Sequence, residues 1–464
     1  MAVAKKQAAQ EKQTMTTRED FYAAGKALRA KTPRKSHAAF NRPAGRFDPV
    51  RLLVASSKGR LAQLIPIRYG RMLPSPFTFY RGAADIMAAD LVHTPDNGIV
   101  VQACGDCHLM NFGGFATPER RVIFDINDFD ETHPAPWEWD VKRLAASFVI
   151  AGRNNNLKAV DCREAAAAAV RSYREHMAEI SEMHVLEAWY SYIDLKALIE
   201  TTKDPELLKT RRKRMKKLMS KNSPALDFSK LVEQRNGRPT IRENPPLIYH
   251  IDERKDPGFS RRVVNALNRY RDSLPHERRV LFDRYSLADI AIKVVGVGSV
   301  GTLCFAALFL SGVGDPLFLQ IKEAGPSVLE PYTAKSLYKN QGQRVVVGQR
   351  IMQAASDIFL GWAQGDNARQ FYFRQLRDAK VSALVETFEA QHLAEYGVAC
   401  GWALARAHSR SGSAARLAGY MGKSDVFDEA IADFAVAYAD QNERDYALFK
   451  RAVRSGKIEA QLGR

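Results

Sequence analysis

The chain has 464 residues, 46 % of them hydrophobic, and a formal net charge of +17. Its length allows about three average domains or one large enzyme, and no apolar run approaches the roughly 20 residues that span a membrane. Five cysteines and a first segment without an apolar export signal predict free thiols in a soluble cytoplasmic protein.

A polar, basic leader precedes the part of the chain that is predicted to fold. Residues 1–45 are interrupted by prolines, so we expect this leader to be flexible. Residues 98–103 form a short apolar run, which predicts a buried strand leading into the loop 104–111, Cys-Gly-Asp-Cys-His-Leu-Met-Asn. Segments 111–116 and 121–127 are predicted as a hairpin.

This loop and hairpin carry the residue types of the acidic half of a phosphoryl-transfer site. Asp106, five residues before Asn111, can accept a hydroxyl proton, while Asn111 and a later aspartate can hold Mg²⁺ through oxygen ligands. Asp128, 17 residues after Asn111, is the predicted ligand, and Asp125, 14 residues after it, is the alternative. A turn whose side chains cap backbone groups would also explain Asp106 and Asn111.

The same loop contains Cys104, Cys107 and His108 in the order C-x-x-C-H, which is typical of haem attachment and resembles a redox pair. Haem attachment goes with export, and the chain shows no export signal. We therefore expect incidental thiols at Cys104 and Cys107.

Helices are predicted to dominate the next part of the chain. Residues 137–151 form an amphipathic pattern after a proline-rich entry, and helical patterns continue from 158 to about 220. Within them, residues 209–217 carry seven positive charges in nine residues. A solvated helix face is the favoured explanation of this run, and nucleic acid or another acidic partner is the alternative.

A glycine-rich motif changes the character of the sequence in its middle. Residues 290–301 are a predicted strand that runs into G-x-G-x-x-G through Gly296, Gly298 and Gly301. A dinucleotide-binding fold would require a long helix directly afterwards. Here the next segment, 302–310, has only nine residues before a glycine-rich turn.

A further apolar segment, 317–323, is predicted as a strand with Lys322 near its end. Two strands around a glycine loop, then a strand ending in lysine, are typical of a kinase nucleotide site. The glycines and Ser299 would then approach the phosphates, and Lys322 would bind them. A dinucleotide site and a glycine-rich hairpin with a surface lysine are the alternatives.

The segments after Lys322 complete this nucleotide half. We expect residues 377–380 to be a hinge that binds adenine through its backbone. The helical segment after Lys322 contains no glutamate that could pair with it, so Glu330, just before this segment, is the candidate partner. Three helices and one strand are predicted here: 333–355, the strand 370–376, 384–407 and 430–453.

The acidic half resembles the aminoglycoside and choline kinase branch of the protein-kinase-like superfamily, whose loop reads H-G-D-x-H-x-x-N before an apolar strand and I-D-F. Four positions match, and Cys104 stands in place of the first histidine: Gly105, Asp106, His108 and Asn111. The resemblance implies that Asp106 and His108 are catalytic and that Asp128 binds metal. Asp140 resembles the aspartate that opens the next helix in that branch.

From about residue 45 onward the chain resembles the bacterial family catalogued as domain of unknown function 2252, through Cys-Gly-Asp-x-His-Leu-x-Asn-Phe-Gly and Pro-Trp-Glu-Trp-Asp. The order of the parts implies a circularly permuted, two-lobed kinase-like fold of the α+β class. Residues 46–284 would form a helix-rich lobe with the catalytic loop, 285–380 a β-rich nucleotide lobe, and 381–464 a helical segment that completes the larger lobe.

Together the two half-sites predict a phosphotransferase that uses ATP and Mg²⁺. The resemblance implies a small hydroxyl- or amine-bearing substrate. A nucleotide-binding regulatory module without turnover and an adenylyl transferase are the alternatives. The permuted fold requires Lys322 and the glycine motif to face the acidic loop across one cleft, with Lys322 close to Asp128 or Asp125.

Overall fold

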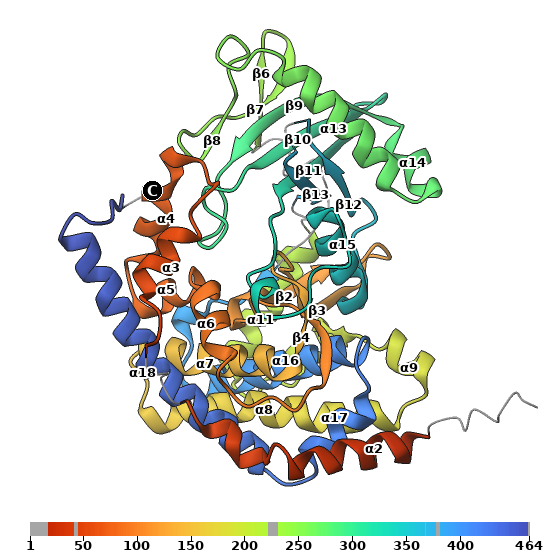
Figure 1. Ribbon diagram of the computed structural model, residues 1–464. Helices are drawn as coiled ribbons and strands as arrows, with labels where there is room; N and C mark the ends of the chain where they lie inside the picture. Colours follow the sequence, from red (N-terminus) through yellow and green to blue (C-terminus); the bar gives the residue numbers. More distant parts are fainter. Residues whose placement is uncertain (1–16, 41–44, 221–230, 367, 377–380, 463–464) are drawn as a thin grey trace, which may run out of the picture.

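A computed structural model describes residues 17–40, 45–220, 231–366, 368–376 and 381–462. These residues form a mixed α+β protein in which helices predominate, so the predicted α+β class is confirmed. A six-stranded sheet occupies one end of the molecule and a helical assembly, called here the helical part, occupies the other (Figure 1). Within the described ranges, no helix combines the length and the apolar character needed to cross a membrane.

The six-stranded sheet is antiparallel and has the order β12-β13-β11-β10-β9-β8. Its strands and covering elements are β8 Ile248–Tyr249, β9 Tyr285–Lys293, β10 Cys304–Ser311, β11 Pro316–Glu323, β12 Gly361–Gln364 and β13 Gln370–Gln375, with α13 Phe259–Ser273, α14 His276–Phe282, β6 Val232–Arg235 and β7 Arg238–Ile241. Because side chains alternate along a strand, Phe305 and Phe309 of β10 face the core beneath α13. Ala306 and Leu308 face the other side, against the β6–β7 hairpin.

The residues after the glycine motif form a strand and not a helix. β10 begins at Cys304, and it pairs with β11 so that Cys304 lies opposite Lys322. The dinucleotide-binding alternative is therefore wrong, because that fold places a helix directly after the glycines.

The helical part is built around α7, α8, α16 and α18. Its helices are α2 Arg18–Ala27, α3 Pro49–Ala55, α4 Ile65–Met72, α5 Pro76–Arg81, α6 Ala84–Leu91, α7 Trp137–Asn154, α8 Ala159–Glu182, α9 Val185–Tyr190, α10 Leu195–Glu200, α11 Pro205–Ser220, α16 Ala390–Ser409, α17 Ala414–Met421 and α18 Val426–Arg454. α16 packs closely on α8, and α18 crosses both α7 and α8. These contacts enclose one continuous apolar core.

Short strands hold the acidic loop against the helical part. β1 Val100–Ala103 pairs with β4 His133–Pro136, and β2 Phe112–Ala116 pairs with β3 Val122–Ile126. The predicted hairpin is therefore confirmed. β5 Ile193–Asp194 and β14 Val381–Ser382 extend it on either side.

Two segments differ from the sequence-based expectation. Residues 18–27 of the predicted flexible leader form α2, because Thr17 and Asp20 make a capping box. The helix predicted over 333–355 is the shorter α15, Gln341–Met352, which begins after the N-cap residue Asn340. The predicted hinge, 377–380, lies outside the described residues.

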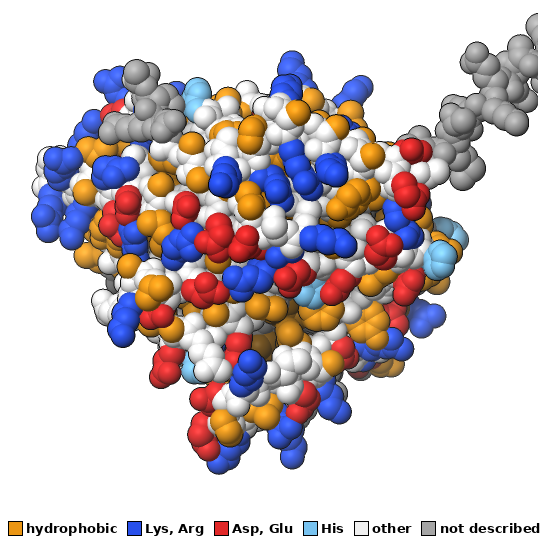
Figure 2. Space-filling view, turned by 90° about the horizontal axis from the view of Figure 1, so that it is seen from below, with side chains coloured by type: hydrophobic (Ala, Val, Ile, Leu, Met, Phe, Trp, Pro, Cys, Tyr) orange, Lys and Arg blue, Asp and Glu red, His pale blue; other side chains and the backbone are white. Residues whose placement is uncertain are grey.

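The surface of the helical part carries both signs of charge. Seen from that end, acidic and basic side chains are interspersed (Figure 2). The net charge of +17 is therefore not gathered into a single-sign field on this face.

Gly401→Ala should lower the free energy of unfolding by about 2–3 kcal/mol, since overpacking at a helix contact costs this much. A Cβ at this position of α16 would lie 2.1 Å from the carbonyl oxygen of Ala169 in α8. Urea denaturation measures the loss. Gly312→Ala, in the β10–β11 turn with no atom within 4 Å of the added Cβ, is the matched control and should change stability by less than about 0.5 kcal/mol. Equal effects of the two substitutions would contradict the packing described for α16 and α8.

Candidate active site

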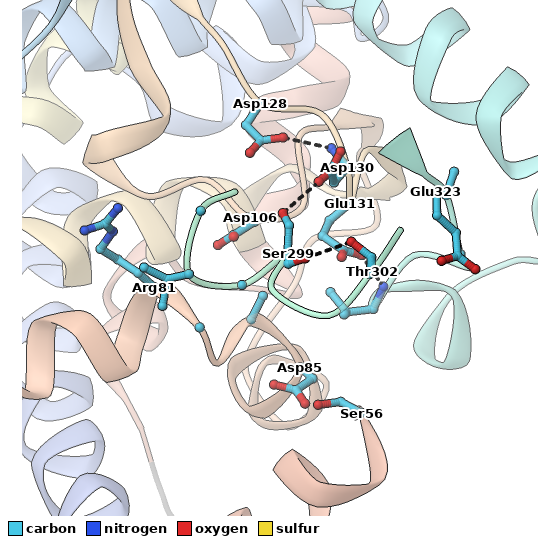
Figure 3. A pocket seen from close by; sticks show the side chains of 18 of the residues that line it. Ser56, Arg81, Asp85, Asp106, Asp128, Asp130, Glu131, Ser299, Thr302 and Glu323 are labelled. Carbon is cyan, nitrogen blue, oxygen red and sulfur yellow. Dashed lines mark hydrogen bonds between the residues drawn. The ribbon is translucent and has the colours of Figure 1, made fainter. Parts of the chain in front are cut away.

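A cavity of about 480 Å³ lies between the sheet and the helical part (Figure 3), which is within the size range of ligand pockets. One side is formed by the loop before β2 and the segment after β3, and the other by residues 296–302, called here the glycine loop. The first side, called here the acidic wall, contributes Asp106, His108, Asn111, Asp128, Asp130 and Glu131. The glycine loop contributes Gly296, Gly298, Ser299 and Thr302. Most of the predicted site residues therefore meet at one cavity.

Lys322 joins the sheet to the acidic wall through Asp130. Nζ of Lys322 forms an ion pair with Oδ2 of Asp130 and lies 3.4 Å from Oγ of Ser299. Ser299 itself donates a hydrogen bond of 3.2 Å to the same carboxylate oxygen. Burial would raise the pKa of Asp130, but the charge of Lys322 and hydrogen bonds from Lys322 and Tyr372 lower it to about 2. Asp130 is therefore ionised and fixed.

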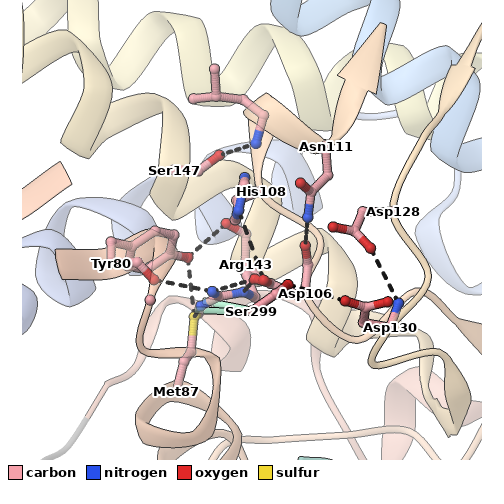
Figure 4. A network of polar contacts seen from close by, with 12 residues as sticks. Tyr80, Met87, Asp106, His108, Asn111, Asp128, Asp130, Arg143, Ser147 and Ser299 are labelled. Atoms are coloured by element: carbon pink, nitrogen blue, oxygen red, sulfur yellow. Dashed lines mark hydrogen bonds and ion pairs between the residues drawn. The ribbon is translucent and has the colours of Figure 1, made fainter. Parts of the chain in front are cut away.

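Asp106 is held by Arg143, which projects from α7 (Figure 4). Nε of Arg143 donates a hydrogen bond of 2.7 Å to Oδ1 of Asp106, and Nη2 contacts the same atom. Oδ2 receives no hydrogen bond from a described residue, and the Asp106 side chain remains 23 % exposed. Burial raises the pKa of Asp106, and Arg143 opposes this rise. One carboxylate oxygen is thus left open to the cavity.

His108 lies behind Asp106. Its Nε2 is 3.8 Å from Oδ2 of Asp106, too long for a hydrogen bond, and its buried Nδ1 has no hydrogen-bond partner among the described residues. Burial, followed by the charge of Arg143, lowers the pKa of His108 well below its ordinary value. The imidazole is therefore neutral.

Asn111 and Asp128 leave oxygen atoms free for a cation. Nδ2 of Asn111 donates to the backbone carbonyl of Asp106 at 2.7 Å, which leaves Oδ1 without a donor from the described residues. The backbone N–H of Asp130 donates to Oδ1 of Asp128 at 3.3 Å, and Oδ2 of Asp128 accepts no hydrogen bond from a described residue. Burial, and then the charge of Asp130, raises the pKa of Asp128. This donor set fits Mg²⁺, which typically takes one or two carboxylates together with water and phosphate oxygens.

Asp125, the alternative metal ligand, does not line this cavity. Both of its carboxylate oxygens lie 2.7 Å from Nη2 of Arg406, and Oδ2 also accepts from the backbone N–H of Ala354 at 2.9 Å. Asp125 is a β3 residue whose side chain turns toward α16, so protein donors occupy its oxygens. Its place is in the core and away from the site.

Glu330, the predicted partner of Lys322, makes a different contact. Its Oε1 accepts a hydrogen bond of 3.0 Å from the backbone N–H of Ser336, and Lys322 pairs with Asp130 instead. The neighbouring helix α15 presents Arg344 to the site, and this guanidinium donates to the carbonyl oxygen of Asp130 at 2.8 Å. The helix in which a glutamate partner for Lys322 was expected therefore provides Arg344, which holds the backbone of Asp130.

Glu131 brings a titratable group into the cavity at physiological pH. It lines the cavity beside Asp130, and its Oε2 accepts a hydrogen bond of 2.7 Å from the backbone N–H of Val328. Burial raises the pKa of Glu131 to about 7, although Arg344 and this hydrogen bond oppose the rise.

The glycine loop is fastened to the segment between α3 and α5. Nη1 of Arg60 donates to the carbonyl oxygens of Gly298 and Val300 at 2.8 and 2.7 Å, and Nη1 of Arg71 donates to that of Gly296 at 2.5 Å. Gly296 and Gly301 adopt φ values of +69° and +92°, which glycine tolerates without strain. The loop therefore has a defined position, in which three of its carbonyl oxygens accept hydrogen bonds from arginine side chains.

Polar side chains fill the space beside Lys322 under the sheet. Gln320, on the same face of β11, accepts a hydrogen bond of 2.9 Å from Nε of Arg374 and lies 3.4 Å from Sγ of Cys304. The cavity extends in the other direction, past the glycine loop and toward α3, α5 and α6.

Cys104, Cys107 and Asp140 are the one group of three described residues whose potential metal-binding atoms lie within 4.8 Å of one another. The oxygens of Asp140 already accept from the backbone N–H groups of Cys104 and Gly105, at 2.6 and 3.0 Å, and one lies 3.1 Å from Nε2 of His408. Burial raises the pKa of both thiols, which opposes the thiolate that a metal needs. These residues do not fit a metal, and Asp140 shapes the loop.

The basic run 209–217 lies on α11. Arg212 pairs with Glu200, Arg211 lies 3.3 Å from Glu395, and Arg214 donates to the carbonyl of Ser382 at 2.9 Å. Part of this charge is therefore used within the protein.

The geometry above defines a mixed α+β protein with a polar site between its sheet and its helical part. The family model described as "Uncharacterized protein conserved in bacteria (DUF2252)" matches residues 60–452. Because the match covers most of the chain, the protein belongs to this family. No curated protein and no solved structure matches the chain.

Several residues of the site were not among the predicted ones. Asp130 is two positions from Asp128, and the repeated acid in Asp128-Phe-Asp130 was a visible but ambiguous signal. Arg143 and Arg60 carried no local signal, because their roles depend on contacts between distant segments.

Asp125→Asn should lower the free energy of unfolding by about 3 kcal/mol, because it leaves the buried Arg406 guanidinium without its counter-charge. Asp128→Asn should leave the stability unchanged or raise it, because burial and Asp130 already disfavour the Asp128 charge. Urea denaturation at pH 7 compares the two variants. An equal loss in both would show that Asp128 also has a structural partner.

Glu131→Gln should change how stability depends on pH. The folded pKa of about 7 exceeds the ordinary value of 4.5, so the folded state binds more protons between these values, and stability is lost as the pH rises from about 4.5 to about 7. The glutamine variant should lack this loss, which is at most about 3 kcal/mol. Denaturation at pH 5 and pH 8 measures it, with Glu179→Gln, at an exposed position of α8, as the control. Parallel pH profiles for Glu131→Gln and the unmodified protein would refute the shift.

Proposed function

We propose that the protein is a circularly permuted, two-lobed, kinase-like phosphotransferase that transfers the γ-phosphoryl group of ATP to a small molecule. The observation that carries the proposal is the meeting of Asp106, Asp128 and the glycine loop around one cavity. Ser299 of that loop contacts Asp130 although the two lie 169 positions apart in the chain. A phosphoryl-transfer site needs a positioned base, oxygen ligands for a metal and a cradle for phosphates, and residues for all three line this cavity.

In this proposal Asp106 receives the proton of the acceptor hydroxyl. Arg143 opposes the rise that burial causes in the pKa of this carboxylate and fixes Oδ1, while Oδ2 stays available for the acceptor. The neutral His108 adds no positive charge that would make this carboxylate a weaker base.

The phosphates would lie between the glycine loop and the acidic wall. Oδ1 of Asn111 and Oδ2 of Asp128 would hold Mg²⁺, which when bound supplies positive charge to the phosphate oxygens. Lys322 would orient the phosphates from the sheet, in exchange for part of its contact with Asp130. Ser299 lies beside that contact, and its hydroxyl would donate a hydrogen bond to a phosphate oxygen.

The contacts of α16 support the proposed permutation. In an unpermuted kinase-like chain a long helix precedes the catalytic loop. Here α16 comes nearly 300 positions later and still packs against β1 and β3, on either side of that loop. Its Arg406 and His408 contact Asp125 and Asp140.

Adenylyl transfer is a second candidate. It is favoured because protein side chains occupy the space beside Lys322. Gln320 and Arg374 occupy the sheet face next to the lysine, and the open cavity lies beyond the glycine loop. A nucleotide whose base lay in that open part would direct its α-phosphate toward Asp106. Incubation with α-labelled and γ-labelled ATP separates the two candidates, because phosphoryl transfer moves only the γ label and adenylyl transfer only the α label.

Asp106→Asn should reduce transfer of the γ label to metabolites of a cell extract by roughly 10²–10⁴-fold, the usual contribution of a general base. It should leave the thermal shift caused by ATP and Mg²⁺ almost unchanged, because this residue faces the acceptor. Label transfer and the thermal shift are measured on the same preparations.

Asp315→Asn, at an exposed position in the β10–β11 turn, is the matched control and should keep full transfer. Normal turnover by Asp106→Asn would exclude Asp106 as the base. Binding of ATP without transfer of either label would favour a regulatory nucleotide-binding module.

A further inference from the structure

One end of the cavity is lined by basic side chains that have no acidic partner. Lys58, Arg60, Arg68 and Arg81 all line this end. Arg60 and Arg68 are hydrogen-bonded to backbone carbonyls and serine hydroxyls, and none of the four forms an ion pair with a described residue. Asp85 lies at the same end, and its buried Oδ2 is also without a hydrogen-bond partner in the described part of the chain. Asp85 and Glu131 act on Arg60 and Arg68 only at longer range, so the positive charges at this end have no direct counter-charge among the described residues.

Arg81 is the member of this group whose guanidinium is most available. It ends α5, its buried Nε has no hydrogen-bond partner among described residues, and its guanidinium carbon lies 5.8 Å from the Phe77 ring centroid. Glu386 and Asp106 attract it electrostatically without an ion pair. An arginine with unclaimed donors in a cavity is suited to bind a phosphate or carboxylate, often through two parallel hydrogen bonds.

Arg81 lies on one side of Asp106, and Asp130, the ion-pair partner of Lys322, lies on the other. The charge of Arg81 acts on Asp106 and His108, whereas that of Lys322 acts on Asp128 and Asp130. Figure 3 shows Asp106 between Arg81 and Asp130. In the proposed reaction the nucleotide phosphates occupy the Lys322 side, so the Arg81 side is left for the acceptor.

We propose that the acceptor is an anion: a hydroxyl compound with a phosphate or carboxylate group that Arg81 and Lys58 bind while its hydroxyl reaches Asp106. This inference rests on the proposed phosphotransferase function. The acceptor oxygen forms a bond to the γ-phosphorus, the bond from that phosphorus to the β–γ bridging oxygen breaks, ADP leaves, and the proton passes to Oδ2 of Asp106. Aminoglycosides and choline are cations, which this end of the cavity would repel.

The test uses inorganic phosphate as the probe and the full-length protein saturated with Mg²⁺ and an ATP analogue whose β–γ bridge cannot be hydrolysed. Isothermal titration should show phosphate binding to this complex. Arg81→Gln should weaken the binding of phosphate roughly tenfold or more, as expected for loss of a charge-assisted contact, and should change analogue affinity less than twofold. Arg261→Gln, at an exposed position of α13, is the matched control and should change neither.

Competition between phosphate and the analogue would overturn the proposal, since the basic residues would then serve the nucleotide phosphates. Phosphate affinity that is unchanged in a folded Arg81→Gln variant would also overturn it. If that variant does not fold, Lys58→Gln at an exposed position is judged by the same criteria. Failure of the analogue to bind, with phosphate binding that still depends on Arg81, would reject the phosphotransferase function and leave the anion site standing.

Discussion

The ion pair between Lys322 and Asp130 is the contact on which the arrangement of the site depends. It joins residues 192 positions apart and fixes the sheet against the acidic wall. Asp106, Asp128 and Asp130 approach one another in a cavity, where low solvation makes like charges costly. Arg143 and Lys322 offset this cost at two of the three carboxylates. Asp128 is the one of these three carboxylates without a direct ion pair to a described residue. A bound cation would therefore stabilise Asp128 more than the other two.

The helical core sets the shape of the acidic loop from behind. Asp140 at the start of α7 accepts from two consecutive backbone N–H groups of the loop, and His408 of α16 contacts the same carboxylate. His408 is in turn 2.9 Å from the hydroxyl of Tyr173 in α8. Three helices from different parts of the chain therefore determine the position of Asp106.

Local signals in the sequence were sufficient for the hairpin β2–β3 and for the glycine loop. Both predictions used alternating apolar residues and the positions of glycine and proline, which are patterns among neighbouring residues in the chain. The hairpin and the strand after the glycine loop agree with the structure. The capping box of Thr17 and Asp20 was also a local signal, and it was overlooked in a segment of polar composition. The N-cap at Asn340 likewise explains why α15 is shorter than its apolar pattern indicated.

The partners of the charged residues could not be predicted in this way. Asp125 and Asp128 have similar spacing from Asn111, and only the packing of α16 shows that Asp125 meets Arg406. The choice between Glu330 and Asp130 as the partner of Lys322 likewise depends on where β11 meets the segment after β3. Such choices follow from the tertiary arrangement, and spacing alone does not contain them.

The hydrogen bonds from Arg60 and Arg71 to the glycine loop have a kinetic consequence. Kinase-type glycine loops move to admit and release nucleotides. In the proposed phosphotransferase, such a movement would require three arginine–carbonyl hydrogen bonds to open together. Leu61 adds a fourth, from its backbone N–H to the carbonyl of Gly301 at 2.7 Å. The residence time of a ligand beneath the loop would therefore depend on the stability of the segment between α3 and α5, which lies outside the sheet that carries the loop.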